Sequence, residues 1–189
     1  MKKIKKIDLI DIAAIFVTIS SLFSSVSWIS SSNAGGEADD LKTAALGYMI
    51  LRLESSTQAS TELVQAQSYI TQAGMYFAEA DSEDDKDVQS YLFDLGNQSI
   101  EMANFHASVS VEAENRTQNY YENYSVSLER ATQLGNLAAL RTTSALMFTI
   151  SAIVTSIVGI FKRKEIFYVN IPIFLIAVYY LVISLVFPV

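Results

Sequence analysis

Three long apolar segments constrain this 189-residue chain more than any other feature. They run over Leu9–Ile29, Ala145–Phe161 and Phe167–Phe187. Each is about as long as the apolar stretch of a helix that crosses a bilayer. A segment that crosses alone must be helical, because hydrocarbon offers its backbone no hydrogen-bond partner. The sequence therefore predicts an all-α, multi-pass membrane protein with three transmembrane helices.

Charged residues are sorted between the segments that separate these spans. One basic cluster precedes the first span and another lies between the second and third: Lys2, Lys3, Lys5 and Lys6, then Lys162, Arg163 and Lys164. The middle segment, 31–141, holds six Lys and Arg against seventeen Asp and Glu, a net charge of −11. Cytoplasmic loops carry the Lys and Arg excess. We therefore expect a cell-membrane protein with a cytoplasmic N-terminus and an extracytoplasmic middle segment and C-terminus.

These features divide the chain into three expected domains. Residues 1–33 form a cytoplasmic tail and the first transmembrane helix, 34–141 an external acidic helical hairpin, and 142–189 a transmembrane hairpin of the second and third helices. The basic start and Ser32–Ala34 also fit a cleavable signal peptide. The first apolar segment is as long as a spanning helix, however, which favours a retained signal anchor.

The middle segment has helical periodicity on both sides of an acidic break. Apolar residues recur at helix-compatible steps over 37–80 and again over 88–138. In the break, Ser82 and Asp85 resemble a capping box. The pattern predicts a long external antiparallel hairpin of coiled-coil type, with Gly35 and Gly36 as the hinge between membrane and arm. Two helices bury little apolar area, so self-association or docking on a partner is expected.

Small residues form a stripe on each of the first two spans. The packing candidates, spaced alternately by four and three, are Ser20, Ser24, Ser27 and Ser31, and Ala145, Thr149, Ala152, Ser156 and Gly159. Small residues let membrane helices approach closely and let hydroxyl groups bond across the interface. The alternative is a serine-lined pore, which is disfavoured because no charged residue lies deep in any span.

The ends of the first and third spans have simpler interpretations. Asp8 and Asp11 are expected to cap the first helix, where the helix dipole favours carboxylates; a proton or cation site is the alternative. The third span is bulky and largely unpatterned, which is typical of a lipid-facing helix. Asn170 and Pro172 are expected to start it, since proline is tolerated in a first helical turn.

Two further sets of residues in the middle segment are candidates for surface roles. Three acceptor sequons for N-glycosylation begin at Asn97, Asn115 and Asn123, and their restriction to the expected external segment makes a glycoprotein a reasonable prediction. Tyrosine is enriched at interfaces, so Tyr120, Tyr121 and Tyr124 form the best candidate contact patch, although a packed seam near the membrane is the favoured explanation of the cluster.

No arrangement of residues predicts catalysis. His106 is the only histidine and the chain has no cysteine. The acidic run Asp81–Asp87 lacks the glycine turn and terminal glutamate of a calcium-binding loop. Phosphate loops and nucleophile motifs do not occur. We therefore expect no enzyme activity, no catalytic or metal-binding residues and no cofactor, and the acidic charge argues against nucleic acid as a partner.

In layout, the chain resembles a family of small uncharacterised prokaryotic membrane proteins with three spans and an external helical hairpin. The resemblance rests on the junction Ser30–Ala34 and the turn Phe161–Tyr168. It implies no catalytic residues. A looser similarity is to chemoreceptor ligand-binding bundles, which also place a helical hairpin outside the membrane.

Together these patterns predict a non-enzymatic structural or accessory membrane protein. It would assemble through the external hairpin and the small-residue stripes, as a homo-oligomer or as a subunit of a larger membrane complex. Its partners would be itself or other membrane-complex subunits, within the lipid bilayer. The alternative is an extracytoplasmic sensor or binding module, and a transport role ranks third.

Overall fold

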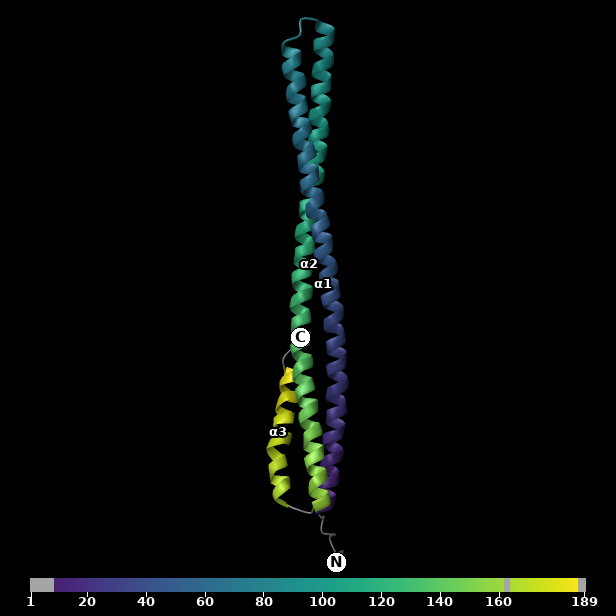
Figure 1. Ribbon diagram of the computed structural model, residues 1–189, viewed down its shortest axis with the longest axis vertical. Coiled ribbons are helices and arrows are strands. Elements are labelled where there is room, and N and C mark those ends of the chain that lie inside the picture. The colour runs from purple at the N-terminus through teal and green to yellow at the C-terminus, as the bar shows by residue number, and fades with distance from the viewer. Residues whose placement is uncertain (1–8, 162–163, 187–189) are drawn as a thin grey trace, which may run out of the picture. The chain divides into compact units, whose positions relative to one another are not determined.

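The computed structural model describes residues 9–161 and 164–186. Over these residues the chain forms three α-helices, α1 (Leu9–Asp81), α2 (Lys86–Phe161) and α3 (Lys164–Val186) (Figure 1). Each is long and apolar enough to cross a membrane. The predicted all-helical fold with three candidate spans is therefore confirmed. The N-terminal lysine cluster, Asp8, Lys162, Arg163 and Phe187 lie outside the described residues.

The chain divides into two compact units, and each is considered by itself. Unit 1 combines Met1–Lys42 with Leu128–Val189, and unit 2 is Thr43–Ser127. Both α1 and α2 therefore contribute residues to each unit. The predicted domain boundaries at 33/34 and 141/142 concern the expected edge of the membrane and not the division into compact units. They remain a prediction.

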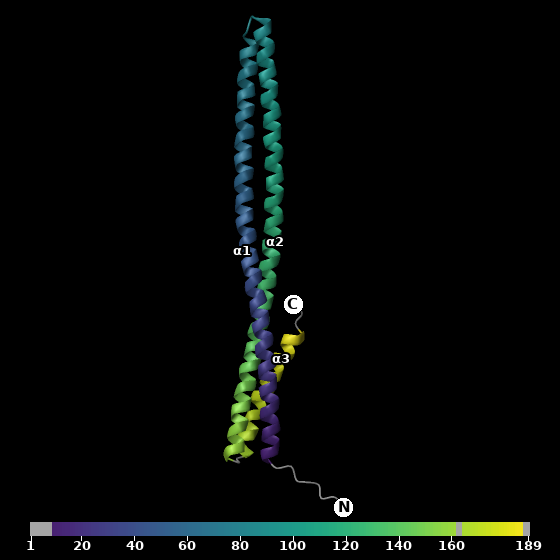
Figure 2. The ribbon, with the colours of Figure 1, turned by 90° about the vertical axis from the view of Figure 1, so that its right-hand side faces the viewer.

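In unit 1 all three helices contact one another. Ala34 and Ala38 of α1 form an apolar cluster with Leu134 and Leu137 of α2. The α3 helix lies beside α2 (Figures 1 and 2), and it contacts α1 as well through the aromatic rings of Phe167 and Phe16, whose centroids are 5.5 Å apart. These contacts make unit 1 a three-helix bundle.

The predicted hinge at Gly35 and Gly36 is wrong, because α1 is continuous through both glycines. A glycine inside a helix costs about 1 kcal/mol relative to alanine. The neighbouring Ala34 and Ala38 are almost completely buried in the cluster with α2. We infer that this packing holds the segment helical against the low helix propensity of the two glycines.

The predicted start of the third helix at Asn170 and Pro172 is also wrong, because α3 begins at Lys164 and contains Pro172 in its interior. Proline removes one helical hydrogen bond. The residues before it are held by contacts with other helices: Phe167 packs on Phe16, and Asn170 Nδ2 donates to Thr155 Oγ1 at 2.6 Å. Neighbouring helices are a known reason why membrane helices tolerate proline.

In unit 2, α1 and α2 run antiparallel. Gln89 Nε2 donates to the carbonyl oxygen of Ala80 at 3.0 Å, and Ser110 Oγ donates to that of Ala59 at 2.8 Å. The buried residues of α2 follow a four–three spacing, which keeps one seam facing a partner helix. They are Leu92, Gly96, Ser99, Ala103, Ser110 and Ala113. The buried residues that α1 contributes to unit 2 are small: Ala45, Ser55, Ala66, Ala73 and Ala80.

The turn between α1 and α2 lies where the sequence predicts, but its capping differs from the expected box. Asp85 caps α2, since its Oδ1 accepts from the backbone N–H of Asp87 at 2.9 Å and of Val88 at 3.5 Å. Ser82 Oγ instead donates to the carbonyl oxygen of Glu79 at 2.9 Å. Ser82 therefore completes the end of α1, and the carboxylate adjacent to α2 serves as its N-cap.

At Gly96 an aromatic ring of α1 lies close to the backbone of α2, which gives a first prediction. A Cβ added there would lie 2.7 Å from Cδ1 and Cζ of the Phe77 ring. Overpacking of this kind costs about 1–3 kcal/mol, which outweighs the helix propensity that alanine gains. We expect Gly96→Ala to lower the unfolding free energy of unit 2, measured by hydrogen exchange of its amides in the full-length protein.

Two variants control this prediction. Gly74→Ala should stabilise by up to about 1 kcal/mol, because nothing lies within 4 Å of its added Cβ. In a Phe77→Ala background, Gly96→Ala should change sign and become stabilising. Destabilisation that persisted without the Phe77 ring would contradict the packing explanation.

Candidate functional site

The serine stripe of α1 contacts α2 throughout unit 1. Ser24 Oγ donates to the carbonyl oxygen of Ala145 at 3.0 Å and lies 2.8 Å from Thr149 Oγ1. Ser31 Oγ donates to the carbonyl oxygen of Ala138 at 2.8 Å and lies 2.6 Å from Thr142 Oγ1. Hydroxyl groups of one helix thus reach the backbone of the other, which requires a close approach of the two helices.

The remaining packing candidates are less uniform. Ser20 is buried, with its Oγ 3.4 Å from Ser151 Oγ, and Ser27 is buried without a hydrogen-bond partner in the described part of the chain. Ala145 is buried and Ala152 is half-buried. Ser156 is exposed and donates only to the Ala152 carbonyl of its own helix. Gly159 lies on α2, and its surroundings fall outside the description.

A second polar stripe joins α2 to α3 and has no counterpart in the sequence interpretation. Asn170, Ala177 and Ser184 of α3 are buried at a spacing of seven. Ser144 Oγ of α2 donates to the carbonyl oxygen of Ala177 at 3.0 Å, as Asn170 does to Thr155 Oγ1. Most of α3 is uncovered, as expected for a lipid-facing helix, but this buried stripe was not predicted. The seven-residue spacing was the available signal, hidden among bulky residues.

Unit 2 contains a polar node within its otherwise small-residue seam. His106 Nδ1 of α2 lies 2.6 Å from Glu62 Oε2 of α1, and both side chains are largely buried. Tyr69 stacks on the imidazole, with ring centroids 5.3 Å apart. Because these groups satisfy each other only in one alignment, the node favours a single register of α1 against α2.

The predicted tyrosine patch is divided between two environments. Tyr120 and Tyr124 are half-buried, whereas Tyr121 is exposed. The guanidinium carbon of Arg52 lies 4.7 Å from the centroid of the Tyr121 ring, a cation–π contact. The Tyr124 ring stacks on Tyr121 at 6.5 Å. Of the three tyrosines, only Tyr121 is exposed, and Arg52 lies over its ring.

A groove of about 520 Å³ opens on α1 next to this patch. Its walls are mostly apolar, with one cation: Leu46, Met49, Ile50, Arg52, Leu53, Ser56 and Thr117. The four large apolar side chains among these residues are all more than half exposed. A contiguous exposed apolar patch is a feature of interaction sites.

The three sequon asparagines are exposed but lie within α2. The hydroxyl groups of the sequons are engaged by helix carbonyls: Ser99 donates to Leu95 at 2.9 Å and Thr117 to Ala113 at 2.9 Å. Glycosylation remains a prediction. Attachment would have to precede helix formation, since the acceptor motif belongs to loops in folded proteins.

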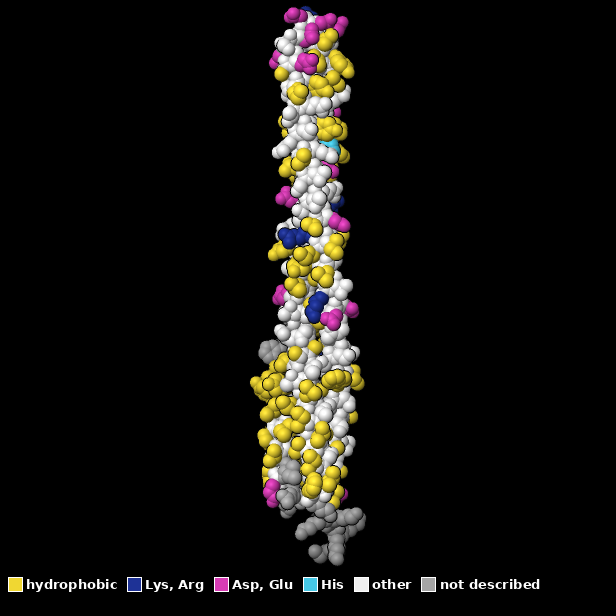
Figure 3. All heavy atoms as spheres, in the orientation of Figure 1, with side chains coloured by type: hydrophobic (Ala, Val, Ile, Leu, Met, Phe, Trp, Pro, Cys, Tyr) yellow, Lys and Arg dark blue, Asp and Glu magenta, His cyan; other side chains and the backbone are white. Residues whose placement is uncertain are grey.

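Carboxylates gather around the turn between α1 and α2 (Figure 3). Backbone N–H groups already engage two of them, Glu83 and Asp85. Among the described residues, no three His, Asp or Glu side chains are placed to hold a metal ion together. At the start of α1, Asp11 lies exposed in the first turn, where the dipole favours it.

Compared with known proteins, the chain matches no family model, no curated protein and no solved structure. The resemblance to the family of small prokaryotic three-span proteins therefore stays a prediction. The function must be argued from the helices themselves.

Proposed function

We propose that the protein is a non-enzymatic structural or accessory membrane protein. Unit 1 anchors it in the cell membrane, and the helical hairpin of unit 2 stands outside as an assembly element. It works as a homo-oligomer or as a subunit of a larger membrane complex. The proposed orientation follows the basic clusters, with residues 31–141 and the C-terminus outside.

The observation that carries this proposal is the exposed apolar surface of unit 2. Leu46, Ile50, Leu53 and Val64 of α1 are each at least 60% exposed. Two packed helices leave their outer sides uncovered, and apolar surface of this extent is stable in water when another helix covers it. The small-residue seams add to the argument, because they serve packing between helices and not chemistry.

Native mass measurement of the full-length protein in mild detergent tests the proposal. We expect a complex of at least two chains, since burial of apolar surface favours association. The same measurement at increasing salt should leave the complex intact, because α1 carries few charged residues between Thr43 and Ala78 and screening weakens charge contacts only. A stable monomer from which no partner dissociates would contradict the proposed assembly role.

An extracytoplasmic sensor or binding module is the second candidate function. The groove beside Arg52 favours it, since an apolar wall with a single cation suits an amphiphilic anion. The same native mass measurement separates the two proposals: a bound small molecule on each monomer supports the sensor, and an assembly of chains without one supports the structural role.

A further inference from the structure

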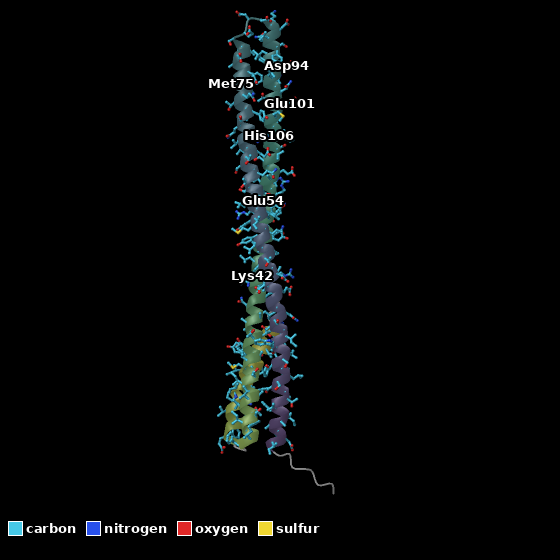
Figure 4. The ribbon with its side chains drawn as sticks, turned by 45° about the vertical axis from the view of Figure 1, so that its right-hand side comes forward. Lys42, Glu54, Met75, Asp94, Glu101 and His106 are labelled. Carbon is cyan, nitrogen blue, oxygen red and sulfur yellow. The ribbon has the colours of Figure 1, made fainter. Side chains whose placement is uncertain are left out.

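The two helices of unit 2 differ in the charge of their outer sides. Every seventh residue on the outer side of α1 forms a stripe, here the α1 outer stripe, which consists of Ile50, Thr57, Val64, Thr71 and Ala78. The matching α2 outer stripe consists of Asp94, Glu101, Ser108, Asn115 and Glu122. All ten side chains are exposed, yet only the α2 outer stripe is charged. Figure 4 shows the contrast: Asp94 and Glu101 lie on the side of α2 away from α1, and Met75 lies on the opposite side of the pair.

The neutrality of α1 extends beyond its outer stripe. Between Thr43 and Ala78, where the structure describes every residue, α1 carries three charged residues, Arg52, Glu54 and Glu62. Glu62 is occupied by His106 in the seam. An exposed helix face normally bears charged side chains. This face instead bears Leu46, Ile50 and Leu53 at its start, followed by hydroxyl and small residues.

We propose that this face of α1 packs against the same face of α1 in a second copy of the chain. The inference rests on the proposed membrane assembly, because two copies in one bilayer share one orientation and their α1 helices must then run parallel. Identical residues meet across a two-fold axis, which makes the contact self-complementary and closed. Leu46, Ile50 and Leu53 form its apolar anchor.

Charge is the first reason why the partner is a second copy meeting α1 on α1. In this arrangement both acidic α2 outer stripes point away from each other into solvent. Contact between two α2 outer stripes would instead place Asp94, Glu101 and Glu122 next to their own copies, and like charges at such distances oppose association. The acidic α2 outer stripe therefore disfavours contact between two α2 helices, and the nearly uncharged face of α1 remains as the contact surface.

Size is the second reason. The stretch Leu46–Ala78 is 33 residues long, which gives a face roughly 50 Å long and about 10 Å wide at the rise and diameter of an α-helix. Two such faces bury on the order of 1,000 Å², the size at which specific interfaces begin. Confinement of both copies to one membrane raises their effective concentration, so an interface of this size suffices.

Disulfide crosslinking of single-cysteine variants tests the inference in the full-length, membrane-embedded protein, which has no cysteine of its own. The test variants are Thr57→Cys and Thr71→Cys on the α1 outer stripe. The matched controls, Ser108→Cys and Asn115→Cys, lie on the α2 outer stripe, where both residues are also exposed. We expect a covalent dimer, with twice the mass of one chain, from the two α1 variants and not from the two controls.

Any other result overturns the inference. The contrary results also show whether the inference fails alone or together with the proposed function. Dimers from the α2 controls alone would place the interface on the wrong helix while keeping the assembly. A native complex of two or more copies without any covalent dimer would place the contact between copies on another face. A monomeric native mass without crosslinks would overturn the inference and the proposed function together.

Charge insertion gives a second readout that does not depend on thiol geometry. Thr57→Glu in each copy would place two carboxylates within the proposed contact, next to its apolar anchor, and we expect the native mass to fall to that of one chain. Ser108→Glu is the control and should leave the mass unchanged. Both side chains are exposed within their own chain, so neither variant disturbs the seam, and an intact dimer in Thr57→Glu would contradict the inference.

Discussion

Cysteine in place of Ser82 is expected to react with a membrane-impermeant thiol reagent on intact cells, whereas cysteine in place of Glu165 is not. In the proposed topology, the turn before α3 lies in the cytoplasm and the turn between α1 and α2 lies outside, because cytoplasmic loops carry the Lys and Arg excess. The effect is all-or-none, because a bilayer excludes the reagent completely. The chain has no other cysteine that would add background labelling.

The structure removes one ambiguity from this experiment. Ser82 and Glu165 are both exposed, so a difference in labelling reports the side of the membrane and not burial. Both variants should react once the cells are permeabilised. Labelling of the Glu165 variant alone on intact cells would show the opposite topology. That result would also overturn the glycosylation and external-assembly proposals.

The helices of this protein were predictable because their signals are local and strong. Apolar segments of bilayer length predict the three candidate spans, and the acidic break between two helical patterns predicts the turn at Ser82–Asp85. In contrast, the continuity of α1 through Gly35 and Gly36 depends on packing against Leu134 and Leu137. Residues a hundred positions away decided that outcome, and local propensity pointed the other way.

The contacts of α3 show a second limit of sequence reasoning. Asn170 reads as a helix-start residue beside Pro172, but its amide bonds Thr155 on α2. That partner is fixed by how α3 folds back on α2, which no local pattern specifies. The seven-residue spacing of Asn170, Ala177 and Ser184 was nevertheless visible, and weighing small residues above bulky ones would have revealed it.

The residues of α1 and α2 that face each other in unit 2 can be predicted from the sequence once the position of the turn is known. The pairs Ala80 with Gln89 and Ala59 with Ser110 are both centred on the peptide between Asp84 and Asp85. Counting outward from the turn therefore brings Glu62 close to His106. The length and geometry of the turn set this register, so the polar node follows from the turn and not from any motif around the histidine.

The largest loss of stability from a single substitution is expected for Phe148→Ala. Phe148 of α2 is fully buried in unit 1. Its ring stacks on Phe23 of α1 at 5.4 Å and meets Phe174 of α3 edge-on at 5.5 Å. One side chain thus joins all three helices, and truncation of a buried phenylalanine typically costs about 3–5 kcal/mol.

Phe161→Ala is the matched control, since it deletes the same atoms from a side chain that is 65% exposed. Unfolding of the full-length protein in mixed detergent micelles, followed by circular dichroism at increasing denaturing detergent, compares the two variants. Helices in a membrane associate through van der Waals packing, so a cavity between them forfeits contacts that lipid cannot replace. If neither α1 nor α3 packed on α2 in the bilayer, Phe148 would face lipid much as Phe161 does. Equal and small losses in both variants would therefore overturn the three-helix packing of unit 1, and a loss confined to Phe148→Ala would support it.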